Sequence, residues 1–345
     1  DGAAGTDTGS GTATDPWKTM TYASTHYATG DTIYVKASAT YTAQVTRPIS
    51  NAKGNEVTWE GYSTTPGDGG RATLDLSSSG SVYGIYASSK NYNVVKNFHV
   101  TGAYYSGFYL SGVSCRVENC VAGTNRQKGF YMTGQYGCLL NCTAYDNGQD
   151  GIYAANGYIY GCWSHDNSTN VSGSYYDLRN SGGQVLHSVF SGSGANAICY
   201  VNGVPAVFMN NVVDGKGVAG YGVYNGNAFG AFIFHNNIIM NCGTGLRMNT
   251  TGYPSSWNVR GNVFDNVTTE QTTNLDYGIV SDNITGTVTF ASEGTSYLGY
   301  ELTGSVGVGA GIDGTGASLG MDAGIIQTVP STGTGTATCR VILTS

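Results

Sequence analysis

Short segments in which apolar and polar or aromatic side chains alternate recur along the chain at a fixed spacing. GFYLSG (107–112), GFYMTG (129–134) and GIYAAN (151–156) begin 22 residues apart. Alternation of this kind is typical of a β-strand with one buried face. A repeat of this length, with Gly and Asn at the bends, predicts that each repeat forms one coil of a solenoid.

The fold class that this repeat predicts is all-β. Leucine-rich repeats have a similar period but need a regular Leu framework, which the chain lacks. We therefore expect a parallel β-helix with coils of about 22–25 residues. Asp15 followed by Pro16 predicts a short helix that caps the first coil. The expected organisation is an N-terminal cap at 1–29, β-helix coils at 30–268, and irregular C-terminal coils with a closing tail at 269–345.

The alternation also predicts which side chains point out of the solenoid. Phe108 and Phe130 should pack inside, which places the neighbouring tyrosines on one outer face. Exposed tyrosines suit sugar rings and protein partners alike. Alternatively, they only stabilise adjacent strands by stacking. The outward column that we expect contains Tyr109, Tyr131, Tyr153, Asp177, Cys199, Tyr224 and Arg247, and its tyrosines are the predicted binding residues.

Two further columns of small polar side chains are predicted at the bends between strands. Stacking is favoured over a metal site for the cysteines because no C-x-x-C pair occurs. One column contains Cys120, Cys142, Cys162, Ser188, Asn211, Asn237 and Asn262, and the other is an asparagine ladder of Asn125, Asn147 and Asn167.

Composition narrows the functions that such a solenoid can have. The 345 residues carry a net charge of −7, and the 15 Lys and Arg are scattered, which argues against nucleic-acid binding. The same scarcity counts mildly against a polyanion as substrate. Apolar runs such as AFIF (231–234) are far shorter than the roughly 20 residues of a membrane-spanning helix.

Three stretches carry a family resemblance: GDTIYVKASATYTAQ (30–44), VTWEGYSTTPGDGGRATLD (57–75) and AGIDGTGASLGMDAGIIQ (310–327). The chain resembles the pectate-lyase-like right-handed β-helix superfamily. The resemblance implies a right-handed solenoid and an extracellular, cell-surface or virion location. It leaves the activity open, because the superfamily includes lyases, hydrolases, tailspikes, adhesins and non-catalytic virion proteins.

The nearest enzyme pattern is that of polysaccharide lyase family nine. In that family calcium binds the substrate carboxylate and a Lys removes the neighbouring proton, with ligands in A-D-G-F and D-D-G-F-D strands and the base in a G-F-K strand. Asp150 matches the first strand and Asp177 the last Asp of the second. Gly173 and Ser174 replace the D-D pair, and Cys199 replaces the Lys. The resemblance thus leaves half of the calcium ligands and the base missing.

Four carboxylates are the candidate ligands of a calcium ion. Asp146 and Asp166 both follow a column Cys by four residues, so they should lie on adjacent coils, close to Asp150 and Asp177. Calcium takes six to eight oxygen ligands, which such a group could supply. The alternative is that these residues belong to solvated turns, which Asp and Asn favour.

Other residues would have to act if the protein is an enzyme. Lys128 lies one coil before Asp150, Arg179 and Arg247 could bind a carboxylate, and Asp150 with Asp177 could form a hydrolase pair. His165 and His187 are further acid–base candidates. The favoured hypothesis is a non-catalytic protein that contacts glycans or identical subunits through its tyrosines. The alternatives are a calcium-dependent lyase of uronate polymers, a glycan hydrolase, or a self-assembling filament subunit.

Overall fold

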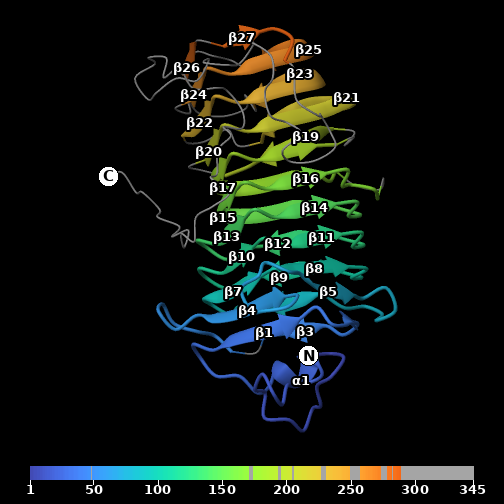
Figure 1. Cartoon of the computed structure of the whole chain (residues 1–345). Coiled ribbons are helices and arrows are strands. Elements are labelled where there is room, and N and C mark those ends of the chain that lie inside the picture. Colours follow the sequence, from blue (N-terminus) through green and yellow to red (C-terminus); the bar gives the residue numbers. More distant parts are fainter. Residues whose placement is uncertain are drawn as a thin grey trace.

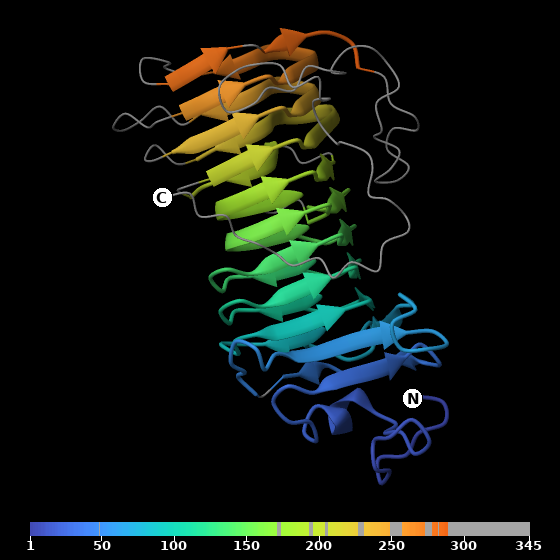
Figure 2. The ribbon, with the colours of Figure 1, turned by 60° about the vertical axis from the view of Figure 1, so that its left-hand side comes forward.

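The computed structural model describes residues 1–288 except 48, 171–173, 193–195, 204–205, 227–230, 249–256, 273–277 and 282. In these residues the chain winds into coils that stack along one axis and form three faces of parallel β-structure (Figures 1 and 2). The predicted all-β parallel solenoid is therefore confirmed.

Each coil contributes a strand to each of three sheets. The first sheet contains, in order along the stack, β1 (Thr32–Lys36), β4 (Val57–Tyr62), β7 (Asn93–Lys96), β10 (Arg116–Glu118), β13 (Cys138–Leu140), the second halves of β15 (Ile152–Tyr160) and β17 (Leu178–Leu186), β20 (Ala206–Met209), β22 (Phe232–His235), β24 (Trp257–Arg260) and β26 (Gly278–Ser281).

The second sheet follows the first after a tight bend. It contains β2 (Thr40–Tyr41), β5 (Ala72–Asp75), β8 (Phe98–Thr101), β11 (Val121–Gly123), β14 (Thr143–Tyr145), β16 (Trp163–His165), β18 (Val189–Ser191), the first parts of β21 (Val212–Asn225), β23 (Ile238–Met248) and β25 (Val263–Thr272), and β27 (Ile284–Thr285).

The third sheet, called the tyrosine sheet below, completes each coil. It contains β3 (Val45–Thr46), β6 (Ile85–Ala87), β9 (Phe108–Leu110), β12 (Phe130–Met132), the first halves of β15 and β17, β19 (Ala197–Val201), and the second parts of β21, β23 and β25.

The core is a set of stacked apolar columns inside the coils. Phe108 and Phe130 pair across β9 and β12, and their stacked rings have centroids 4.8 Å apart. The same inward column continues through fully buried side chains, which keeps each short strand in register with its neighbours. It consists of Ile85, Phe108, Phe130, Ile152, Leu178, Cys199, Val223 and Leu246.

The bend between the first and second sheets explains the predicted cysteine column. The Cys120 N–H donates to Cys142 Sγ over 3.4 Å, and the Cys162 N–H donates to Ser188 Oγ over 3.1 Å. From Ser188 on, each N–H of the column donates to the next Asn Oδ1, which links Ser188, Asn211, Asn237, Asn262 and Asn283. The column is therefore structural, as predicted, and its cysteines Cys120, Cys142 and Cys162 are free thiols.

The N-terminal cap contains the helix α1 (Met20–Ala23), whose Met20 and Ala23 are buried at the end of the stack. Its N-cap is Thr19, whose side chain accepts a hydrogen bond from the Tyr22 N–H. The predicted helix start at Asp15 was wrong because the Asp15 carboxylate instead accepts from the Ser10 N–H within the preceding loop.

The C-terminal boundary stays a prediction. Strand β25 crosses the proposed boundary after residue 268, and beyond it β26 extends the first sheet and β27 the second. Residues 289–345 lie outside the described part of the chain. In the described residues no helix is long and apolar enough to cross a membrane.

Candidate functional site

One outward column runs the length of the tyrosine sheet. The rings of Tyr109, Tyr131 and Tyr153 follow one another with centroids 5.1 and 5.0 Å apart, which confirms that they stack on successive coils. The column is longer than predicted and contains two cations. Its members are Tyr86, Tyr109, Tyr131, Tyr153, Arg179, Tyr200, Tyr224 and Arg247.

The strand register corrects two predicted members of this column. Tyr153 pairs with Arg179, two residues beyond the expected Asp177, and Arg179 pairs with Tyr200. Cys199 faces the interior and is fully buried, so it does not occupy the position of the family's Lys. In this register Tyr200 takes the position that the catalytic Lys has in the G-F-K pattern.

Asp177 terminates the predicted asparagine ladder. Asn125 and Asn147 each donate their backbone and side-chain nitrogens to the next ladder Asn, and Asn167 donates both nitrogens to Asp177 Oδ1 over 3.2 and 2.8 Å. A Cβ on Gly192 would lie 2.1 Å from Asp177 Oδ2, so glycine is required there. Burial raises the pKa of Asp177 to about 7, although the Asn167 hydrogen bonds oppose the rise.

A second column lies beside the first, at the residue before each strand-opening glycine. Backbone hydrogen bonds from Gly84, Gly107, Gly129 and Gly151 to the next coil define it. Along the stack it contains Tyr83, Ser106, Lys128, Asp150 and Tyr176. The two columns together bring Lys128, Asp150 and Arg179 into one charged centre on the tyrosine sheet.

The charged centre is held by contacts within and between coils. Arg179 Nε lies 3.6 Å from Asp150 Oδ1, and Asp150 Oδ1 also accepts from the Tyr176 N–H over 3.0 Å. Lys128 Nζ donates to the Gln149 side chain over 2.8 Å and lies 5.0 Å above the Tyr131 ring. Asp150 is buried, whereas 29% of the Arg179 side chain is exposed, so the cation faces solvent and the anion lies beneath it.

Burial sets the protonation behaviour of this centre. Burial lowers the pKa of the Lys128 ammonium; Asp150 opposes this, and the neighbouring positive Arg179 adds to it. Burial likewise raises the pKa of Asp150, against the attraction of Arg179 and Lys128. Asp150 Oδ2 is buried without a hydrogen-bond partner. Perturbed titratable groups that gather beside aromatic walls are typical of functional sites.

Aromatic rings lie on both sides of the charged centre. On the N-terminal side, Tyr83 lies within 4.8–5.1 Å of Tyr86, Tyr105 and Tyr109. On the C-terminal side, the rings of Tyr200 and Tyr176 stack at 5.1 Å. The Arg179 guanidinium lies between Tyr153 and this stacked pair, 5.8, 4.9 and 5.7 Å from the ring centroids of Tyr153, Tyr176 and Tyr200.

The four predicted calcium ligands do not form one site. Asp150 pairs with Arg179 and Asp177 ends the ladder, whereas Asp146 and Asp166 lie in left-handed turns after β14 and β16 of the second sheet. Asp166 is 2.6 Å from Lys216, and a hydrogen bond from His165 lowers its pKa to about 2. In the described part of the chain no three His, Cys, Asp or Glu side chains are arranged to hold a metal.

The register also shows why the calcium site of the resemblance does not fit this chain. The three aspartates of the D-D-G-F-D pattern correspond to Tyr175, Tyr176 and Arg179, and Asp177 takes the glycine position. Only Asp150 remains as a carboxylate, and it is already paired with a guanidinium. A fixed positive charge therefore stands where the pattern would require a ligand for a cation.

The predicted histidines lie away from this centre. His165 stacks on Trp163 of β16 at 3.9 Å on the second sheet, and its Nδ1 is 3.0 Å from Asp166 Oδ2. His187 lies at the bend before β18, where burial lowers its pKa. Neither belongs to the tyrosine sheet.

The predicted column lacks Tyr86, although the repeat motif extends to it. Gly84-Ile85-Tyr86 repeats the G-F-Y motif one coil earlier and identifies Tyr86 as the start of the column. Tyr83 and Tyr105 lie outside the strands, so the alternation contained no information on them.

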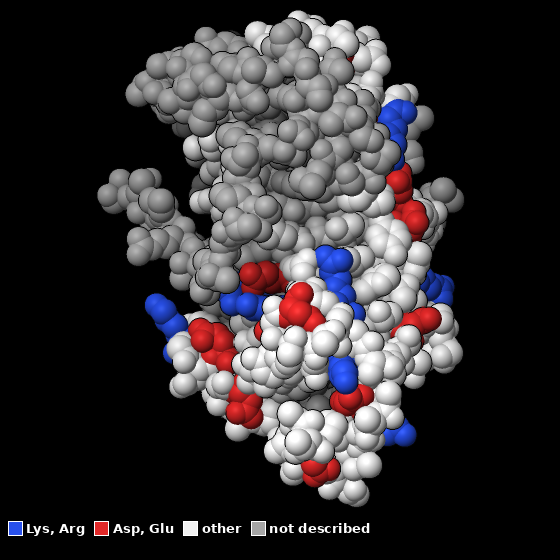
Figure 3. All heavy atoms as spheres, viewed as in Figure 1, with Lys and Arg blue, Asp and Glu red and all other residues white. Residues whose placement is uncertain are grey.

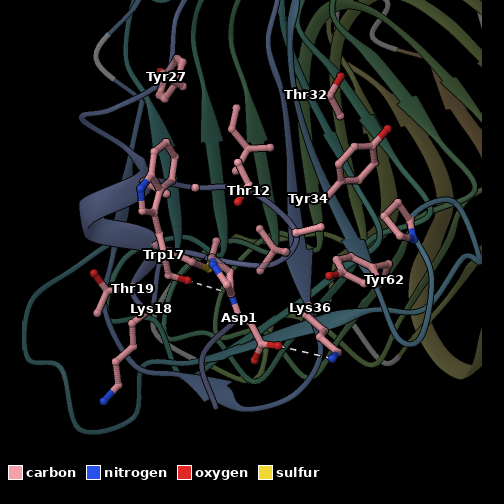
Figure 4. A pocket seen from close by; sticks show the side chains of 18 of the residues that line it. Asp1, Thr12, Trp17, Lys18, Thr19, Tyr27, Thr32, Tyr34, Lys36 and Tyr62 are labelled. Atoms are coloured by element: carbon pink, nitrogen blue, oxygen red, sulfur yellow. Dashed lines mark hydrogen bonds and ion pairs between the residues drawn. The ribbon is translucent and has the colours of Figure 1, made fainter. Parts of the chain in front are cut away.

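A separate cavity of about 330 Å³ lies between the cap and the first coils, and Figure 4 shows the side chains that line it. Trp17 and Tyr34 lie on opposite sides of it, and the Lys36–Asp1 ion pair of 3.3 Å crosses one edge (Figure 4). None of the predicted site residues lines this cavity.

On the face seen in Figure 3, Lys and Arg are interspersed with Asp and Glu over the N-terminal coils, so charge of neither sign gathers there. This distribution agrees with the scarcity of cations in the sequence. A charge-selective site therefore depends on individual cations such as Arg179.

The three parallel sheets define a parallel β-helix. The family model described as "Pel9A-like, right handed beta helix region" matches residues 2–177, and the chain belongs to this family. The handedness expected from the resemblance is thereby confirmed.

Solved structures share the fold at low sequence identity. The crystal structure of pectate lyase Pel9A is 16% identical, with a TM-score of 0.57 over 93% of this chain and 94% of that chain. The complex of XylC with xylose is 10% identical, with a TM-score of 0.53 over 76% of this chain and 66% of that chain. No curated protein matches the sequence.

Proposed function

We propose that the protein binds an acidic polysaccharide along the tyrosine sheet, with Arg179 and Lys128 as the groups that recognise a sugar carboxylate. The observation that carries this proposal is the position of Arg179 between Tyr153 and Tyr200 of the column, beside a lysine of lowered pKa. Guanidinium groups form charge-assisted hydrogen bonds with carboxylates and are well suited to this role.

The geometry of the column suits a sugar chain. Successive tyrosines lie one coil apart, about 4.8 Å along the axis, so a chain parallel to the axis would meet a ring at each step. Aromatic rings contribute apolar area, and their hydroxyl groups can bond to sugar hydroxyls. This surface continues on both sides of Arg179, so the bound carboxylate would belong to an internal sugar of the polysaccharide and not to its end.

Asp150 has a supporting role in this proposal. Its buried carboxylate lies beneath the guanidinium and limits how Arg179 can turn. The Ser174 carbonyl, which accepts from Arg179 Nη2 over 2.7 Å, fixes the group from the other side. A guanidinium that is held in place loses less conformational entropy on binding.

Two further elements belong to the proposal. The site requires no calcium, because Arg179 supplies the positive charge. The place of action is outside the cell, where long acidic polysaccharides occur, and the relation of the fold to pectate lyase Pel9A favours such a substrate class.

Calorimetric titration with acidic and neutral polysaccharides tests the binding function. Arg179→Gln should weaken binding of an acidic polymer roughly 10- to 100-fold, because a charge-assisted hydrogen bond contributes about 1.5–3 kcal/mol. Lys53→Gln removes the same charge from an exposed loop residue and should leave binding unchanged. Equal affinity for acidic and neutral polymers, or an unaffected Arg179→Gln protein, would contradict the proposal.

Cleavage by β-elimination is the second candidate function, and the lowered pKa of Lys128 favours it. Neutral Lys128 would accept the C5 proton of a uronate whose carboxylate is bound by Arg179. The electrons of the C–H bond then form the C4=C5 double bond, the C4–O4 bond breaks, and the leaving oxygen takes a proton from water.

Release of unsaturated sugar products, followed by their ultraviolet absorbance, tests the cleavage. The rate should rise with pH as Lys128 loses its proton, and Lys128→Gln should lower it at least 100-fold, as expected for loss of a general base. Binding without any gain in absorbance would leave the first function standing and exclude the second.

A further inference from the structure

We infer that the polysaccharide is a heteropolymer in which neutral sugars separate the acidic ones, because Arg179 and Arg247 form two separate carboxylate positions with only aromatic and small side chains between them. This inference rests on the proposed binding function and specifies its substrate class. It depends on the second arginine of the column, which the charged centre does not include.

Arg247 lies in an environment that repeats that of Arg179. Its guanidinium is 4.6 Å from the ring centroid of Tyr221 and 5.2 Å from that of Tyr224, and its Nη1 donates to the Tyr221 hydroxyl. Arg179 is similarly placed over Tyr176 and Tyr200. Both arginines are partly exposed on the same column. The two positions are therefore alike in their aromatic surroundings and in their place on the column, whereas the ion pair with Asp150 belongs to Arg179.

The strand register fixes their separation. Arg179 pairs with Tyr200, Tyr200 with Tyr224, and Tyr224 with Arg247, so three coil steps lie between the arginines. At about 4.8 Å for each step, the two cations are roughly 14 Å apart along the axis. A sugar chain parallel to the axis would place more than one residue between them.

The side chains between the arginines disfavour additional carboxylates. In the main column these are Tyr200 and Tyr224, and in the neighbouring column Ala197 and Tyr221, so no described cation stands between Arg179 and Arg247 in either column. The face of an aromatic ring carries a negative potential, which repels an anion and accepts the C–H groups of a neutral sugar. A carboxylate of a homopolyuronate that faced the sheet between the arginines would lose its water without gaining a cation.

On the N-terminal side of Arg179 the described part of the column is again aromatic, with a cation only beside Tyr131. Tyr153, Tyr131 and Tyr109 continue from Arg179, and Lys128 lies beside Tyr131, close enough to Arg179 for each charge to affect the other. Lys128 and Arg179 thus form one cationic position and Arg247 forms the other.

Calorimetric titration of the wild-type chain with three polymers tests the inference. The probes are polygalacturonate, in which every sugar is acidic, gellan, in which neutral sugars separate successive uronates, and dextran, which is neutral. We expect gellan to bind at least tenfold more tightly than polygalacturonate per sugar residue, and dextran to bind weakly. Equal or tighter binding of polygalacturonate would overturn the inference while leaving the binding function intact. Binding of neither acidic polymer would overturn both.

Variants at the second arginine supply the independent measurement. Arg247→Gln should weaken gellan binding about tenfold, whereas Arg247→Lys should recover part of the loss. Lys53→Gln serves as the charge-matched control, and thermal unfolding of each variant shows whether the fold is kept. If folded Arg247→Gln protein binds gellan as the wild type does, the second carboxylate position does not exist.

Discussion

Asn167 donates both its backbone and its side-chain nitrogen to a single oxygen of Asp177, and this pair ends the ladder that begins at Asn125. Every earlier position of the ladder uses an asparagine oxygen as acceptor. The final position uses a buried carboxyl group whose pKa is raised to about 7. The stability of this part of the solenoid therefore depends on pH.

Asp177→Asn should stabilise the protein at alkaline pH. Because the folded pKa of Asp177 lies above its ordinary value, its contribution to stability is complete below about pH 4 and is lost as the pH rises through about 7. Asparagine keeps the acceptor oxygen and carries no charge. Chemical denaturation should show little difference between variant and wild type at pH 4, and up to about 4 kcal/mol in favour of the variant at pH 8.

The exposed turn residue Asp146 supplies the control for this experiment. Asp146→Asn should change the free energy of unfolding by less than about 0.5 kcal/mol at both pH values. A stability difference for Asp177→Asn that does not vary with pH would show that the carboxyl group does not titrate in this range.

Removal of a middle member of the ladder should be strongly destabilising. Asn147 accepts both nitrogens of Asn125 and donates to Asn167 Oδ1 and to the Ala122 carbonyl. Asn147→Ala leaves several buried polar groups without partners, at about 1–3 kcal/mol each. We expect a loss of at least 3 kcal/mol in urea denaturation, whereas Asn202→Ala at an exposed position should lose less than about 0.5 kcal/mol.

Tyrosines of the column should contribute to polysaccharide binding, whereas exposed tyrosines outside the column should not. Tyr131→Ala removes a ring that contacts Tyr109, Tyr153 and the Lys128 ammonium. We expect its affinity for an acidic polysaccharide to fall about tenfold, which corresponds to about 1.4 kcal/mol. Tyr136, with 62% of its surface exposed outside the column, provides the matched control. Similar losses for Tyr131→Ala and Tyr136→Ala would place the polymer elsewhere.

Calcium removal should leave binding unchanged. Arg179 and Tyr176 occupy positions at which the lyase pattern has aspartates, so the positive charge at the site belongs to the chain itself. Titration in the presence of a chelator should give the same affinity as titration in added calcium chloride. A tenfold or greater loss of affinity with chelator would show that a cation takes part after all.

The sequence predicts the fold and the first half of the tyrosine column well, for a physical reason. From Tyr109 to Tyr153 each coil has the same length and the same alternation, so the position of one side chain determines the next. The cysteine column and the asparagine ladder are recognisable for the same reason, because their members bond to one another from coil to coil.

The prediction fails where coil length changes. Arg179 follows Tyr153 by 26 residues, and Asp177 has the same parity as Arg179, so alternation alone fits either residue. The predicted outward position of Cys199 is wrong because Ala197, Ile198 and Cys199 are all buried, which removes the alternation from this strand. The charged centre depends on contacts between Lys128, Asp150 and Arg179. These residues lie on different coils, and the repeat spacing does not predict which side chains meet there.

The end of the asparagine ladder at Asp177 also affects how cooperatively the coils unfold. In a solenoid each coil is stabilised mainly by its neighbours, so the weakest junction divides the molecule into units that unfold separately. Asp177 lies between two coils, and its charge weakens their junction as the pH rises. Above neutral pH the coils before and after Asp177 should therefore behave as two unfolding units, and below it as one.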